Sequence, residues 1–101
     1  MKIIALIPLV VALLVAAPPS ARTVLLGRSW RGRPIRAVEV GNPSGTRVLV
    51  VGCIHGNEKA GIAIARALER VSPSELDLWI VPDLNPDGVA AGTRQNAHGS
   101  I

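Results

Sequence analysis

Residues 47–58 read RVLVVGCIHGNE and contain the transition that decides the fold. The first half is a run of aliphatic, mostly β-branched residues, which is typical of a strand covered on both faces of a sheet. Gly52 ends this run, and His55 and Glu58 follow, three residues apart. We therefore expect a central strand of a parallel or mixed sheet over residues 47–52, with two potential metal ligands just beyond its end.

The segment that follows extends this strand into an α/β unit. Residues 57–71 carry apolar side chains at helical spacing, and Asn57 is placed to cap such a helix. Its apolar face is expected to contain Ala60, Ile64, Ala67, Leu68 and Val71. Residues 76–82 are strand-like, with Trp79 as a packing residue. The order strand, helix, strand predicts a parallel pair with the helix across one face of the sheet.

Two further local patterns flank this unit. Residues 23–26 and 35–40 are short apolar runs separated by a glycine-rich stretch, which favours a β-hairpin. Residues 85–88 read NPDG, a strong turn signal. We expect Asp83 and Asp87 to stabilise that turn rather than to act as acid or base.

The first 21 residues differ in composition from the rest. A lysine at position 2 precedes an apolar run over residues 3–17, and Pro18, Pro19, Ser20 and Ala21 follow. This pattern predicts a secretory signal peptide over residues 1–21, and so a secreted or periplasmic protein. An uncleaved N-terminal anchor is the alternative, and it is the only membrane contact that we expect.

The remaining residues, 22–101, suffice for one small domain at most. A single cysteine, Cys53, excludes an internal disulfide. Arginines crowd the early part of the chain against one acid, Glu39; they are Arg22, Arg28, Arg31, Arg33, Arg36 and Arg47. We interpret them as a solvated hairpin face, with binding to an anionic surface as the alternative. Aromatic residues do not alternate with them, which argues against a nucleic-acid groove.

His55 and Glu58 have the chemistry of half a zinc site. An imidazole nitrogen and a carboxylate oxygen are common zinc ligands, and a catalytic zinc normally takes three protein ligands and a water. Gly56 permits a tight turn between them, and we expect Glu58 in the first turn of the helix, near its positive end. Cys53 and His98 are possible further ligands, although a buried structural cysteine and a loop histidine are the more ordinary interpretations.

Three motifs in order give the chain a resemblance to a known family. They are HGNEKAG at residues 55–61, NPDG at 85–88 and TRQNAHG at 93–99. Together they resemble the M14 zinc carboxypeptidases, especially the bacterial murein-peptide amidase type. The resemblance implies a three-layer α/β fold with a mixed sheet, of the phosphorylase/hydrolase-like kind. It also implies Zn²⁺ ligation by His55 and Glu58, and a role for Arg94 in polarising the scissile carbonyl. A peptide or murein-peptide substrate and a monomeric protein are expected.

The same resemblance implies residues that this sequence does not contain. Such proteins continue into an Asp-x-Asn-Arg-Asn run, and later supply a histidine as third zinc ligand and a glutamate as general base. Here Gly99 is followed by Ser100 and Ile101. We expect residues 22–101 to be the N-terminal part of such a domain, truncated and inactive by itself.

Two other functions stay open at this point. Aspartoacylases and succinylglutamate desuccinylases share the His-Gly-Asn-Glu element, but the signal peptide and residues 93–96 argue against that type. The second alternative is a non-catalytic secreted module that binds an anionic surface through its arginines, a contact that salt would weaken.

Overall fold

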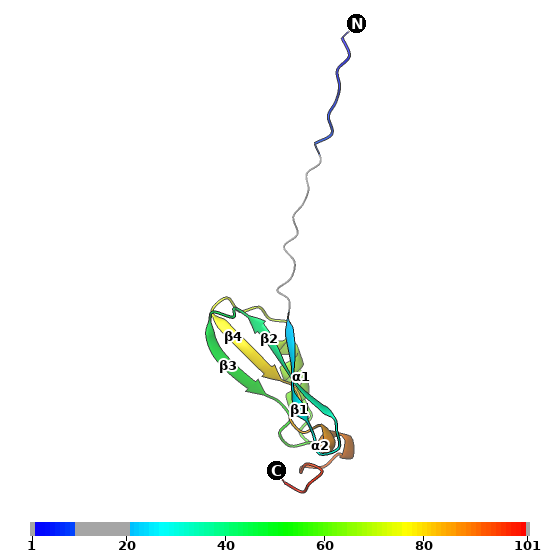
Figure 1. Ribbon diagram of the computed structural model, residues 1–101, viewed down its shortest axis with the longest axis vertical. Coiled ribbons are helices and arrows are strands. Elements are labelled where there is room, and N and C mark those ends of the chain that lie inside the picture. Colours follow the sequence, from blue (N-terminus) through cyan, green and yellow to red (C-terminus); the bar gives the residue numbers. More distant parts are fainter. Residues whose placement is uncertain (1, 10–20, 101) are drawn as a thin grey trace.

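The computed structural model describes residues 2–9 and 21–100 of the chain (Figure 1). Residues 2–9 form neither helix nor strand. The predicted signal peptide falls mainly on residues 1 and 10–20, which lie outside the described residues. In the part of the chain that is described, we find no helix with the length and apolar character needed to span a bilayer.

The described residues form a four-stranded mixed sheet and two helices. The elements are β1 (Arg22–Arg28), β2 (Pro34–Gly41), β3 (Thr46–Val51), α1 (Ala60–Leu68), β4 (Leu76–Val81) and α2 (Pro86–Ala91). The strand order is β1-β2-β4-β3. β1 pairs antiparallel with β2, and β2 pairs antiparallel with β4, whereas β3 and β4 are parallel. The predicted hairpin, the parallel pair and the mixed sheet are therefore confirmed.

The prediction that β3 is a central strand is wrong for the described sheet. β4 lies between β2 and β3, while β3 forms an edge. Ile80 of β4 is fully buried, whereas Leu49 of β3 is 64% exposed. The aliphatic run misled the prediction because its alternate side chains face opposite sides of the sheet, and only one side is covered here.

Helix α1 is shorter than predicted and is rotated relative to the predicted face. It begins at Ala60 after Lys59, so Asn57 does not cap it, and its most buried residue is Ala65. Ile64, on the predicted apolar face, is 63% exposed. Gly61 explains the rotation, because a Cβ at this position would lie 2.9 Å from the backbone nitrogen of Cys53. The bare backbone of Gly61 must therefore face the end of β3.

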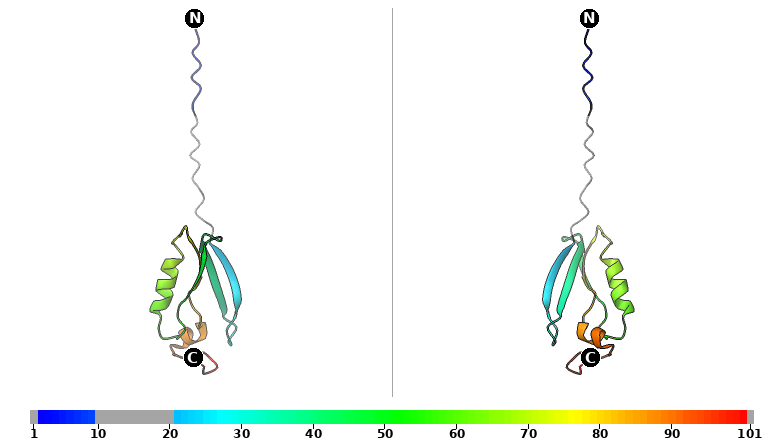
Figure 2. Two further views of the ribbon diagram at one scale, coloured as in Figure 1. Left: turned by 90° about the vertical axis from the view of Figure 1, so that its left-hand side faces the viewer. Right: turned by 90° about the vertical axis from the view of Figure 1, so that its right-hand side faces the viewer.

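The core lies between α1 and the sheet. Val40, Ala65, Leu78 and Ile80 form a buried cluster, against which partly buried side chains of β2, β3 and α1 pack. Figure 2 shows α1 along one face of the sheet and α2 near the end of the strands. One helical layer and the sheet of the predicted three-layer fold are thus present in the described residues.

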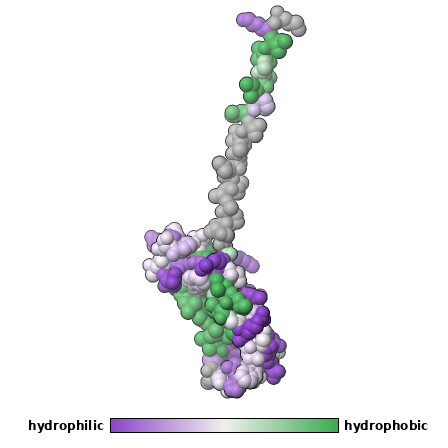
Figure 3. Space-filling model, viewed as in Figure 1, coloured by the Kyte–Doolittle hydropathy of each residue, from purple (hydrophilic) through white to green (hydrophobic). Residues whose placement is uncertain are grey.

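The opposite face of the sheet carries an apolar surface, visible in Figure 3. A groove of about 490 Å³ lies there, lined by Leu26, Ala37, Arg47, Leu49, Val51, Trp79, Val81 and Leu84. Trp79 packs on this face as predicted, with its Nε1 donating to Asp77 and the Arg22 guanidinium 5.2 Å from its ring centre. Leu49 is more than half exposed here, so this face has apolar surface that the described residues do not cover.

The NPDG segment starts a helix instead of forming an isolated turn. Asn85 is the N-cap of α2, with its Oδ1 accepting from the Gly88 N–H at 2.9 Å. Pro86 follows at the first helical position, where its lack of an N–H has no cost, and Gly92 ends the helix in the left-handed conformation. The turn prediction failed because the same residue types also cap helices.

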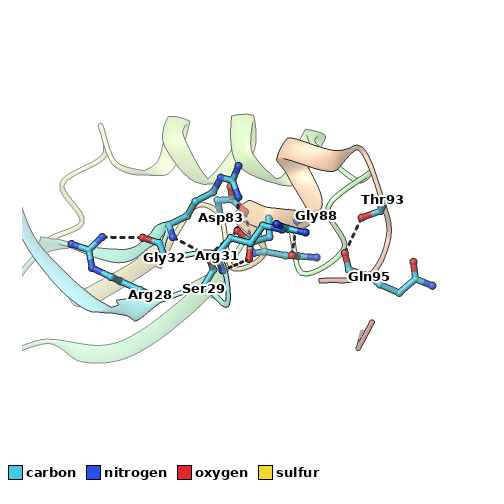
Figure 4. Close-up of polar contacts among 11 residues, drawn as sticks. Arg28, Ser29, Arg31, Gly32, Asp83, Gly88, Thr93 and Gln95 are labelled. Atoms are coloured by element: carbon cyan, nitrogen blue, oxygen red, sulfur yellow. Dashed lines mark hydrogen bonds and ion pairs between the residues drawn. The ribbon is translucent and has the colours of Figure 1, made fainter. Parts of the chain in front are cut away.

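Buried Asp87 of α2 fixes the β1–β2 turn against the helix. Its carboxylate accepts hydrogen bonds from the Ser29 hydroxyl at 2.8 Å, the Arg31 backbone N–H at 3.0 Å and the Arg33 guanidinium at 2.8 Å. Figure 4 shows the turn with Ser29 and Arg31 beside the helix that carries Gly88. Burial alone would raise the pKa of Asp87, but these three donors together lower it below its ordinary value.

We expect Ile80→Ala to lower the free energy of unfolding by about 2–5 kcal/mol, because it leaves a cavity in the core. Leu49→Ala on the edge strand is the matched control and should cost less than about 1 kcal/mol, since Leu49 is 64% exposed. Urea unfolding followed by circular dichroism measures both values. Equal losses would contradict the assignment of the core to the α1 side of the sheet.

The Asp87 network predicts a loss of stability in acid. Because the pKa of Asp87 is lower in the folded chain than its ordinary 3.8, its contribution is present above that pH and is lost as the pH falls further. Asp87→Asn should be less stable at neutral pH and should lose less stability on acidification. Urea unfolding at several pH values between neutrality and strong acid measures this difference. Glu75→Gln, at an exposed position, is the control, and an unchanged acid dependence in Asp87→Asn would refute the prediction.

Candidate metal centre

The candidate metal ligands lie where β3 ends against the first turn of α1. A Cβ at Gly52 would lie 2.6 Å from the Pro82 carbonyl oxygen and 2.7 Å from that of Gly61, so only glycine fits this exit. Cys53 follows with φ of 51°, in the left-handed region that non-glycine residues rarely adopt. The backbone then turns back, and the Glu58 N–H donates to the His55 carbonyl at 3.0 Å. This turn brings the two side chains to the same side.

The structure brings His55, Glu58 and Arg94 together. Nδ1 of His55 lies 3.1 Å from Oε2 of Glu58, and Nη1 of Arg94 lies 3.5 Å from the other carboxylate oxygen. The His55 side chain is 23% exposed, and those of Arg94 and Glu58 are 48% and 61% exposed, so the cluster is open to solvent.

The spacing of the two ligand atoms fits a shared metal ion. Two ligand atoms bound tetrahedrally to one zinc at about 2.0–2.1 Å lie about 3.3 Å from each other. In the structure His55 Nδ1 and Glu58 Oε2 form a hydrogen bond of 3.1 Å, and this distance is also close to that ligand spacing. Zinc ligation by this pair stays a prediction, and the geometry is compatible with it.

Glu58 differs from its predicted place in one respect. It precedes α1, and the first turn of that helix contains no acidic residue. The turn that holds the Glu58 N–H to the His55 carbonyl occupies these residues, so the helix begins only afterwards. The carboxylate is therefore positioned by the turn and not by the helix.

Cys53 is buried and contacts the backbone of the loop over residues 53–58, which carries the two candidate ligands and is called the metal loop below. Its Sγ lies 3.2 Å from the His55 carbonyl oxygen, to which the thiol donates. Burial, together with the nearby carboxylates of Asp83 and Glu58, raises the pKa of this thiol. A neutral S–H donor in this position fits the structural interpretation of Cys53 better than the role of zinc ligand.

The remaining titratable candidates lie apart from the pair. The His98 ring packs on Trp30 of the β1–β2 turn, with ring centres 4.5 Å apart. Asp83 accepts from the Asn85 N–H at 3.0 Å, which agrees with its predicted structural role, and burial raises its pKa. Within residues 2–9 and 21–100, histidine, cysteine and acidic side chains form no group of three that could hold a metal.

A contact between two loops links Arg94 to the loop that carries His55 and Glu58. The Gly56 N–H donates to the Arg94 carbonyl at 3.2 Å. A Cβ at Gly56 would collide with the backbone of Gly88 and would lie 2.5 Å from the Thr93 carbonyl oxygen. The loop carrying His55 therefore packs backbone to backbone on α2 and on the loop after it.

The interpretation of the arginines as a solvated face is incomplete: three of these side chains are 43–75% exposed, but each also pairs with an acid. Arg22 pairs with Glu39 at 2.7 Å, Arg33 with Asp87 at 2.8 Å and Arg47 with Asp77 at 2.9 Å. The contacts of Ser29, Arg33 and Asn85 were not predicted from the sequence, and Asp87 was assigned only to a local turn. The excess of arginine near the hairpin was the one available signal that buried acids elsewhere need partners.

Sequence comparisons identify the family of this geometry. Residues 10–100 match the sequence model of the zinc carboxypeptidases, peptidase family M14. The chain is 31% identical over 91 residues to bacteriocin BCN5 of Clostridium perfringens, covering 79% of this chain and 10% of that protein. It is 30% identical over 100 residues to carboxypeptidase D of Drosophila melanogaster, covering 80% of this chain and 7% of that protein. The chain thus spans a tenth or less of these relatives.

Solved structures share the fold. A metallo-carboxypeptidase from Burkholderia cenocepacia superposes with a TM-score of 0.70 and 27% identity, over 81% of this chain and 27% of that one. Murein-tripeptide amidase MpaA from Escherichia coli O157 superposes with a TM-score of 0.59 and 31% identity, over 83% of this chain and 35% of that one. A succinylglutamate desuccinylase/aspartoacylase from Rhodobacter sphaeroides superposes with a TM-score of 0.63 and 25% identity, over 84% of this chain and 29% of that one. The family model matches nine-tenths of the residues, and the described residues share the fold of these structures. The chain therefore belongs to the zinc carboxypeptidase family M14.

Proposed function

We propose that this chain carries part of the active site of an exported zinc-dependent hydrolase that cleaves peptide or amide bonds in cell-wall peptides. The observation that carries the proposal is the 3.1 Å approach of His55 Nδ1 to Glu58 Oε2, with Arg94 beside them, in a member of this family. The likeness to murein-tripeptide amidase supports the choice of cell-wall peptides.

Each of the three residues has a distinct role in this proposal. His55 and Glu58 hold the zinc ion, which supplies Lewis acidity and an activated water when bound. The Arg94 guanidinium donates hydrogen bonds to the carbonyl oxygen on which negative charge develops. Its single contact with Glu58, at 3.5 Å, is long, so the guanidinium can turn to a substrate at little cost.

The zinc affinity and the activity of the 101-residue chain are expected to be low. Two protein ligands bind zinc more weakly than three, and loss of a general base alone typically costs about 10²–10⁴ in rate. We therefore propose that this chain by itself binds zinc weakly and is inactive. Export follows from the signal-like residues 1–21, with an uncleaved anchor as the alternative.

A second candidate is hydrolysis of acylated amino acids. The superposition with the succinylglutamate desuccinylase/aspartoacylase supports it, and its TM-score of 0.63 is similar to that of the amidase. The signal-like N-terminus and the segment around Arg94 favour the peptide hydrolase. Surface binding through arginines alone is less favoured, because three of these arginines already pair with acids.

Zinc titration tests the metal site directly. We expect one zinc ion per chain, with affinity lowered at least about tenfold by His55→Ala or Glu58→Gln, since each removes half of the protein ligands. His98→Ala is the matched control and should bind zinc as the parent does. Competition with a chromophoric chelator measures the affinities. Equal affinity in all four chains would refute the site, and salt-sensitive polyanion binding without zinc uptake would favour the arginine-surface alternative.

Hydrolysis assays test the substrate class. With zinc, the 101-residue chain should cleave a murein tripeptide no faster than zinc in buffer. The product of any reading frame that continues beyond Ile101 should cleave the tripeptide at least about 10²-fold faster than the 101-residue chain. Arg94→Ala in that longer product should lower its rate about 10²–10³-fold. Liquid chromatography of the released amino acids measures all of these rates. Cleavage of N-acyl amino acids with none of peptides would reverse the order of the two candidates.

A further inference from the structure

Asn85 connects α2 to the loop that carries Arg94. Its side chain is buried, with 6% of the residue exposed. Oδ1 accepts from the Gly88 N–H at 2.9 Å, and this donor fixes the orientation of the amide group. Nδ2 consequently faces the other way and donates to the Arg94 carbonyl oxygen at 3.3 Å. One side chain therefore caps the helix and holds the following loop.

The Arg94 carbonyl also accepts a second hydrogen bond. The Gly56 N–H, in the turn between His55 and Glu58, donates to it at 3.2 Å. The same oxygen atom thus links the metal loop to the buried amide of Asn85. Thr93 anchors the loop as well, by donating from its N–H to the Gly88 carbonyl at 2.9 Å, and the Thr93–Gln95 turn lies beside Gly88 in Figure 4.

The Arg94 side chain has little to hold it in place. It is 48% exposed, and its contact with Glu58 is 3.5 Å long. A long side chain with one weak contact samples many rotamers, so the position of its backbone sets the region that its guanidinium can reach. The backbone contacts at the Arg94 carbonyl therefore matter more for the site than the surface ion pair does.

We propose that Asn85 is a positioning residue for the candidate zinc site: through the Arg94 carbonyl it fixes the place of the guanidinium relative to His55 and Glu58. This inference rests on the proposed function for its catalytic meaning. The hydrogen-bond link itself is a separate claim, and it can be tested without metal.

Two substitutions separate the link from the helix cap. Asn85→Asp keeps an Oδ1 acceptor for Gly88, and Asn85→Ser keeps a shorter, uncharged capping oxygen; both remove the Nδ2 donor. Asn96→Asp is the matched control, because exposed Asn96 uses its Oδ1 as acceptor for His98 and Ser100 in the Arg94 loop. It makes the same chemical change at a position that does not contact the Arg94 carbonyl.

Amide hydrogen exchange of the metal-free chain, measured by NMR, is the first readout. In both Asn85 variants the Gly56 amide should exchange at least about fivefold faster while the Gly88 amide stays protected, because only the Arg94 contact is lost. The control should match the parent at both amides. Unchanged exchange at Gly56 would overturn the proposal. Equal loss of protection at Gly56 and Gly88 would also overturn it, because Asn85 would then act only as a cap.

Cobalt in place of zinc gives the second readout. Paramagnetic Co²⁺ bound to His55 and Glu58 should broaden the Arg94 side-chain resonance in the parent, and less so in the Asn85 variants. Their Co²⁺ affinity should stay within about twofold of the parent, because both ligands remain. Equal broadening of Arg94 in parent and variants would overturn the proposal. Failure of the parent to bind Co²⁺ at His55 would refute the proposed function instead, while the exchange experiment would still decide the role of Asn85.

Discussion

The candidate site depends on a contact between two stretches of bare backbone. Gly56 lies against Gly88 so closely that a Cβ would collide with the backbone of α2, and its N–H donates to the Arg94 carbonyl. This contact brings the end of β3, the start of α2 and the loop after it together at one end of the sheet (Figure 2). A larger residue at position 56 would separate His55 from Arg94 even if neither side chain changed. Glycine here serves close approach rather than flexibility.

The strands were largely predictable because their signals are local. The aliphatic run of β3, the hairpin and the parallel β3–β4 pair follow from residue type and spacing. The phase of α1 did not follow, because its apolar residues allow two faces at similar spacing. The choice between the faces came from the packing of Gly61 on Gly52, which no helical pattern encodes. The edge position of β3 likewise depends on which strands pair, and not on its own composition.

In the candidate site, too, contacts between near neighbours in the sequence were predictable, and contacts between distant residues were not. His55 and Glu58 are three residues apart, so one turn brings them together and the sequence alone predicted the pair. The contact between Ser29 and Asp87 joins residues 58 positions apart, and Glu58 and Arg94 are separated by 36. Without the family resemblance, nothing in the sequence would have connected Arg94 to the pair. The NPDG segment was noticed as a turn, but its asparagine bonds Arg94 only because α2 folds back on the metal loop.

The described residues leave one face of the sheet uncovered. The candidate site lies elsewhere, at the ends of the strands, so the uncovered face does not affect its geometry. On that face the Asp77 Oδ1 atom is buried without a hydrogen-bond partner among the described residues, beside an apolar groove. Proteins normally cover an apolar groove of this kind and give a buried carboxylate oxygen a hydrogen-bond partner. The chain spans 27% of the carboxypeptidase with which it superposes at a TM-score of 0.70. The placement of His55 and Glu58, in contrast, is fixed by contacts of β3, α1 and α2 that lie at the strand ends. The mutual placement of His55 and Glu58 is therefore set by the described residues, whereas these residues leave the far side of the sheet uncovered.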